Sequence, residues 1–88
     1  MRYQVILTDA ADRSFRKLPS HIQKRVQRWL DLLGEDPRRA GTHQLVGYPH
    51  IRRVHASKDY VILYTIDQQQ VAIIVLKVEN RREVYRGL

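Results

Sequence analysis

An arginine and a histidine two positions apart, Arg53 and His55, are well suited to chemistry on a phosphate group. A guanidinium pairs with phosphate oxygens in a planar, bidentate geometry, and an imidazole can donate or accept a proton near neutral pH. In a β-strand, residues two apart point to the same face, so both groups would meet one ligand while Val54 and Ala56 face the core. If that face is a site, the pair suits acid–base chemistry beside a bound phosphate; the alternative is an ordinary exposed histidine on a strand.

The histidines and cysteines argue against a metal centre. The four histidines are dispersed and lack the His-x-x-x-His spacing typical of zinc sites, and the chain has no cysteine. The lack of cysteine also excludes thiolate catalysis and a disulfide framework. We therefore expect no metal ion and no cofactor.

The formal net charge of +7 arises from sixteen Lys and Arg against nine Asp and Glu, and twelve of the sixteen are Arg. Such a field attracts nucleic acid or an acidic protein, without indicating which. Arginine is the better residue for bidentate phosphate contacts. The charge therefore favours a partner rich in phosphate or carboxylate groups.

Length and composition predict one folded domain over residues 1–88. The 43% of hydrophobic residues is enough for one modest core. The apolar run near the N-terminus is too short for a signal sequence or a membrane span. We expect a cytoplasmic protein that does not bind a membrane.

Apolar periodicity predicts an α+β fold in the order β-α-α-β-β-β. The expected elements are a strand over 3–8, helices over 10–18 and 20–33, and strands over roughly 51–56, 59–67 and 70–79. Ser20 and Gln23 have the spacing of a capping box, and Gly34 is expected to end the second helix in a left-handed conformation. Residues 35–50 are a long connection that is either functional or contains a short element near 44–46.

These elements predict an antiparallel sheet with a helical hairpin packed on one face and the other face open. The last three strands follow one another through short links, which makes them antiparallel neighbours. The strand over 70–79 is apolar on both faces and is therefore expected to be central or covered on both sides. Since the helices occupy one face, the open face is where a site would lie.

Several motifs in this order resemble the RelE/ParE superfamily of toxins from type II toxin–antitoxin systems, over essentially the whole chain. They are Leu45-Val46-Gly47, the segment from Asp59 to Asp67 that ends in Tyr-x-Ile-Asp, and the terminal Arg81-Arg82-Glu83-Val84-Tyr85-Arg86. The middle of the chain is similar to the YafQ-like branch and the end to RelE proper. The resemblance implies a RelE/YafQ-like mRNA interferase, a metal-independent endoribonuclease that cuts messenger RNA on the ribosome by 2′-hydroxyl attack and so inhibits translation.

The same resemblance implies the residues of the site. The residues expected to act in catalysis are His43, His55, Asp59, Arg81 and Tyr85, and those expected to bind RNA are Arg52, Arg53, Lys58, Tyr60, Arg82 and Arg86. Cleavage needs a base, an acid and positive charge on the phosphate, and the sequence does not assign these roles one by one. Many relatives carry Arg directly after the position of Tyr60, whereas this chain has Val61, so the source of that charge stays open between Arg53 and Arg81.

Two other functions compete with the nuclease. A ParE-like toxin would inhibit DNA gyrase and cut nothing, and a non-catalytic basic module would bind nucleic acid by charge alone. The presence of His55, Arg81 and Tyr85 disfavours the ParE-like reading, because that branch generally lacks this set. The partners implied by the resemblance are a cognate antitoxin protein, the ribosome and its mRNA, with operator DNA bound only indirectly through the antitoxin.

Overall fold

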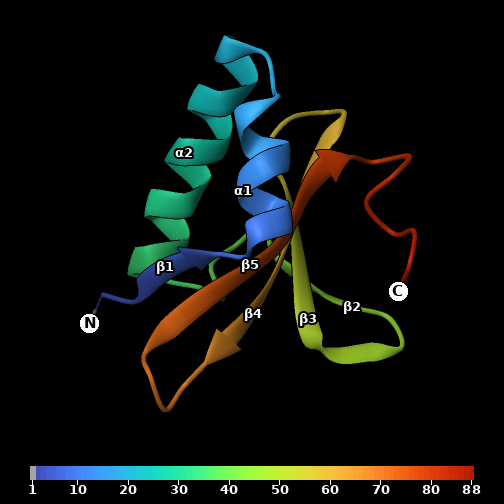
Figure 1. Cartoon of the computed structure of the whole chain (residues 1–88). Helices are drawn as coiled ribbons and strands as arrows, with labels where there is room; N and C mark the ends of the chain where they lie inside the picture. The colour runs from blue at the N-terminus through green and yellow to red at the C-terminus, as the bar shows by residue number, and fades with distance from the viewer. Residues whose placement is uncertain (1) are drawn as a thin grey trace.

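The computed structural model describes residues 2–88. It consists of a five-stranded sheet with both helices packed on one face (Figure 1). The elements follow in the order β1 (Gln4–Leu7), α1 (Asp9–Arg16), α2 (Ser20–Glu35), β2 (His43–Leu45), β3 (Tyr48–His55), β4 (Tyr60–Asp67) and β5 (Ala72–Asn80). The strand order across the sheet is β1-β5-β4-β3-β2. The predicted α+β class and the helical hairpin on one face are confirmed.

The sheet has one strand and one type of pairing that the sequence pattern did not predict. Strand β2 occupies part of the connection over 35–50, and β3 begins at Tyr48 instead of at 51. The register of β2 against β3 shifts between Gln44 and Leu45, which breaks the period-two pattern that reveals a strand. Strand β1 pairs parallel with β5, whereas the other pairs are antiparallel. Local periodicity does not encode such a distant partner.

The junction of the two helices differs from the predicted capping box. The N-cap of α2 is Pro19, and no side chain caps its first amides. The side-chain amide of Gln23 instead donates to the carbonyl oxygens of Phe15 and Arg16 at 3.0 and 3.2 Å, at the end of α1. Gln23 therefore joins the two helices.

Within residues 2–88, no helix is long and apolar enough to cross a membrane.

Gly34 lies inside α2 and not at a left-handed stop, so that prediction was wrong. The helix continues to Glu35, and the Gly34 carbonyl accepts a hydrogen bond from the amide of Tyr3 at 2.7 Å. A Cβ at this position would lie 3.3 Å from the carbonyl oxygen of Tyr3. The close approach of the N-terminal segment to the helix therefore favours glycine here, because a Cβ would be tightly packed against that segment.

Strand β4 is buried on both faces. Ile62 and Tyr64 belong to the main core beneath the helices, while Val61 and Leu63 face the other way. The second face is not fully open as predicted, because residues 81–88 fold back across it and bury Val84 against Val61 and Leu63. Strand β5 lies between β1 and β4, which confirms its predicted central position.

Candidate functional site

Arg53 and His55 lie on the face of the sheet away from the helices, as strand alternation predicts. Val54 and Ala56 are 1% and 4% exposed and belong to the main core. Nη1 of Arg53 lies 3.4 Å from Nε2 of His55. A guanidinium has no acceptor, so this imidazole nitrogen is the acceptor of the contact and a neutral His55 carries its proton on Nδ1. A phosphate paired with Arg53 would therefore lie within reach of the imidazole.

Further polar side chains flank this pair across the strands. His43 on β2 is paired with Arg53, Arg53 with Leu63 on β4, and Leu63 with Lys77 on β5. Directly paired residues place their side chains on the same face. Nζ of Lys77 lies 3.9 Å from Oε2 of Glu79, which is on the same strand face two residues away. A small apolar patch on this surface is formed by Val61, Leu63 and Val84. Arg53 and the histidines lie on one side of the patch, and Lys77 lies on the other.

The C-terminal segment over 81–88 is held on either side of Tyr85. Val84 is fully buried on the apolar patch, and Nζ of Lys77 donates a hydrogen bond to the carbonyl oxygen of Arg86. Tyr85, between these two anchors, is 41% exposed. The anchors fix the backbone of Tyr85 while its side chain remains accessible to a ligand.

Replacing Lys77 by methionine is expected to loosen the end of this segment without unfolding the chain. The lost charge-assisted hydrogen bond should weaken the docked state by roughly 1 kcal/mol, or about fivefold. The Arg86 amide, which donates to the carbonyl of Glu83, should then exchange with solvent faster by that factor in a hydrogen-exchange measurement by NMR. The Arg81 amide, bonded to the Asp59 carbonyl, is the internal control. Unchanged exchange at Arg86 would mean that Val84 alone holds the segment.

Asp59 and Arg81 meet at the end of the sheet where β3 finishes. Nε of Arg81 lies 3.6 Å from Oδ1 of Asp59, and the Arg81 amide donates to the Asp59 carbonyl at 2.7 Å. About half of each side chain is exposed, so the ion pair contributes little and the guanidinium stays available to an incoming phosphate. His55 ends β3 and so lies at this same end of the sheet. The fold thus brings together residues that are far apart in the sequence.

Two of the predicted RNA-binding residues lie on the other face. Tyr60 packs against the main core beneath the helices. Arg52 is paired with Tyr64, whose side chain is in that core, and its Nη2 donates to Oγ1 of Thr42 at 2.8 Å. Neither residue is brought together with His55.

Three further predicted RNA-binding residues are exposed. Lys58 lies in the turn before β4, and Arg82 and Arg86 lie in the C-terminal segment, where Arg86 forms an ion pair with Glu83 at 3.0 Å. Sequence reasoning missed Lys77, although a cation flanked by apolar residues within β5 was the available signal. No cluster of three or more metal-ligating side chains occurs in the part of the chain that the structure describes.

Comparisons with known proteins agree with this architecture. Residues 5–85 match the family model for the ParE toxin of the type II toxin–antitoxin system. The chain is 32% identical to Toxin RelG of Mycobacterium tuberculosis over 90 residues, which covers 98% of this chain and 99% of RelG.

Solved structures of related toxins have the same fold. A chain of the toxin–antitoxin complex RelBE2 from Mycobacterium tuberculosis superimposes with a TM-score of 0.80 at 26% identity, covering 92% of this chain and all of that chain. The isolated RelE toxin of E. coli superimposes with a TM-score of 0.79 at 24% identity, covering 89% of this chain and 83% of RelE. The family match spans nearly the whole chain and the RelG match covers almost all of both proteins, so this chain belongs to the RelE/ParE superfamily of toxins from type II toxin–antitoxin systems.

Proposed function

We propose that this toxin is a metal-independent endoribonuclease that cuts messenger RNA on the ribosome in the cytoplasm and so inhibits translation. The observation that carries the proposal is the 3.4 Å contact between the Arg53 guanidinium and the His55 imidazole on an accessible face of the sheet. His43 lies opposite Arg53 on the neighbouring strand. This arrangement supplies a phosphate-binding group next to a proton-transfer group, which are two requirements of RNA cleavage.

The reaction uses the nucleophile that RNA itself carries. The 2′-hydroxyl loses its proton to a base and attacks the adjacent phosphorus, the bond from phosphorus to the 5′-oxygen breaks, and an acid protonates that oxygen. The products are a 2′,3′-cyclic phosphate and a 5′-hydroxyl. In this proposal Arg53 stabilises the charge on the crowded phosphate, and His55 carries out one of the two proton transfers.

In this proposal four further predicted residues, Asp59, Arg81, Tyr85 and His43, support this centre. Arg81 and its partner Asp59 lie at the same end of the sheet as His55, where the guanidinium adds positive charge and the carboxylate orients it. Tyr85 is held at the edge of the apolar patch and offers an aromatic face on which an unpaired base can stack. His43 is the second candidate for proton transfer.

A cognate antitoxin is the proposed protein partner. The solved RelBE2 structure is a complex of a toxin with its antitoxin, and the basic surface of the present chain suits an acidic segment. In this proposal the antitoxin covers the nuclease face and alone provides contacts to operator DNA.

Primer extension on a defined messenger RNA in a purified translation system tests the proposal. We expect new 3′ ends that appear only when ribosomes are present.

The matched family model describes a ParE toxin, so inhibition of DNA gyrase is the second candidate. If the mRNA stays intact while gyrase supercoiling is inhibited, the nuclease proposal is wrong and the ParE-like function replaces it. If neither mRNA cleavage nor gyrase inhibition is detected, a non-catalytic nucleic-acid-binding module is the remaining candidate.

A further inference from the structure

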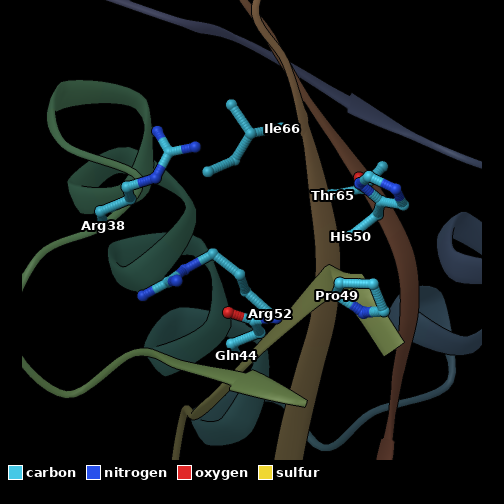
Figure 2. A pocket seen from close by; sticks show the side chains of 7 residues that line it. All are labelled: Arg38, Gln44, Pro49, His50, Arg52, Thr65 and Ile66. Atoms are coloured by element: carbon cyan, nitrogen blue, oxygen red, sulfur yellow. The ribbon is translucent and has the colours of Figure 1, made fainter. Parts of the chain in front are cut away.

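A polar cavity lies on a different part of the surface from the Arg53–His55 pair. It has a volume of about 150 Å³ and is lined by Arg38, Gln44, Pro49, His50, Arg52, Thr65 and Ile66. Figure 2 shows the guanidinium groups of Arg38 and Arg52 on the same side of strand β4, with Gln44 beside Arg52. No carboxylate is among the lining residues.

Both arginines keep unused capacity to donate hydrogen bonds. Neither Arg38 nor Arg52 forms an ion pair within residues 2–88. Nη2 of Arg52 is held by the hydroxyl and carbonyl oxygens of Thr42 at 2.8 and 3.3 Å, which fixes the orientation of the guanidinium. Its Nε is buried and has no hydrogen-bond partner among the described residues. A buried donor without a partner is costly, so a small shift of the guanidinium toward a bound anion would be favourable.

The acidic residues next to the cavity in the sequence are already engaged. The carboxylate of Asp36 accepts the backbone amide of Arg38 at 3.1 Å. The carboxylate of Asp67 accepts the amides of Gln69 and Gln70 at 3.0 and 3.1 Å. These carboxylates cap their own turns, and neither forms an ion pair with Arg38 or Arg52 among the described residues.

We propose that this cavity is a second phosphate site, which binds the phosphodiester backbone of RNA through Arg38 and Arg52 and serves for docking. A phosphodiester offers two anionic oxygens, each with several lone pairs, so it can accept from two guanidinium groups and the neighbouring Gln44 amide together. A carboxylate also offers two oxygens, so the arginines alone do not select between the two anions. RNA is named as the ligand because the proposed function brings RNA to this protein.

Strand alternation places this site away from the proposed cleavage centre. Arg52 and Arg53 are consecutive on β3 and point to opposite faces of the sheet. The RNA segment in the cavity is therefore separate from the scissile phosphate. The inference rests on the proposed function only in naming RNA as the ligand, because phosphate binding here requires no cleavage.

Inorganic phosphate is the first probe. In a titration followed by NMR, the Arg52 Nε–H signal, assigned through Arg52→Lys, is expected to shift in a saturable way that chloride at equal ionic strength does not reproduce. Arg38→Gln should weaken this binding about tenfold, the effect of one charge-assisted hydrogen bond. The matched control Arg28→Gln removes an exposed arginine from α2 and should leave it unchanged. No saturable shift, or equal weakening in both variants, would overturn the proposal.

RNA binding distinguishes the possible sources of the phosphate. Affinities of the wild type and Arg38→Gln are measured for ribosomes and, separately, for a messenger oligonucleotide with 2′-deoxy residues that cannot be cut. We expect about a tenfold loss for at least one of them, with a salt dependence shallower by nearly one unit of slope. The affected RNA identifies the ligand, and no loss for either one contradicts the proposal. Weaker binding of polyglutamate by Arg38→Gln, with RNA binding unchanged, would assign the cavity to an acidic protein instead.

The two proposals fail in distinguishable ways. If primer extension shows no mRNA cutting but phosphate still binds, only the nuclease proposal is wrong. If mRNA is cut but the Arg52 Nε–H signal does not shift with phosphate, only the proposal of a second phosphate site is wrong.

Discussion

Replacing His55 by alanine is expected to lower the rate of mRNA cleavage by about 10²–10⁴-fold, the contribution of a positioned acid or base. Its imidazole is the proposed proton-transfer group next to Arg53, and its side chain is exposed, so the substitution should not disturb the core. The rate is measured by primer extension over a time course in the purified translation system. Circular dichroism and urea unfolding should show a fold and a stability like those of the wild type.

Gln27→Ala is the control for this substitution. Gln27 is an exposed, uncharged residue in the middle of α2, and its side-chain amide donates to Asp31 on the same helix, so the variant should retain full activity. A His55→Ala protein that cuts within about threefold of the wild type would remove His55 from the chemistry, because general acid–base catalysis contributes far more than this. The same measurement on His43→Ala would then identify the histidine that transfers the proton.

Replacing Tyr64 by alanine is expected to lower the free energy of unfolding by about 3–5 kcal/mol, the cost of deleting a large buried ring. Tyr64 is fully buried, and its hydroxyl donates to the carbonyl oxygen of Pro37 at 2.6 Å. Domains of this kind have only about 5–15 kcal/mol of stability in total, so a large fraction of the molecules could unfold. Urea denaturation followed by circular dichroism measures the loss.

Tyr64→Phe separates the hydroxyl from the ring. Without its donor, the carbonyl of Pro37 loses its partner, and we expect a loss of about 1–3 kcal/mol. The exposed Tyr48 provides the control, since Tyr48→Phe should be neutral. A neutral Tyr64→Phe would contradict the role of this bond in fixing the connection that leads from α2 to His43.

Periodicity along the sequence was sufficient to predict the helices, the main strands and the shared face of Arg53 and His55. Alternation with Val54 and Ala56 is a local property, and burial in one core enforces it. The central position of β5 followed in the same way from its apolar residues on both faces. These predictions depended only on neighbours within a few residues.

Long-range contacts set the features that the sequence did not reveal. The parallel pairing of β1 with β5 and the return of Val84 across Val61 join segments that local patterns cannot connect. The shift in register between β2 and β3 prevented the sequence pattern from revealing β2, because the shift depends on how the two strands pair. The bonding partners of the side chains were equally hidden, since Gln23 was expected to cap its own helix and instead binds the end of the preceding one.

The lengths of the strands taper from the middle of the sheet to both of its edges. The inner strands β4 and β5 have eight and nine residues, whereas the outer strands β1 and β2 have four and three. An edge strand exposes unpaired backbone groups that can recruit an edge of another molecule, and a short edge offers few of them. The free toxin should therefore resist self-association through its sheet, which would let it remain dispersed at the concentrations reached once its inhibitor is removed.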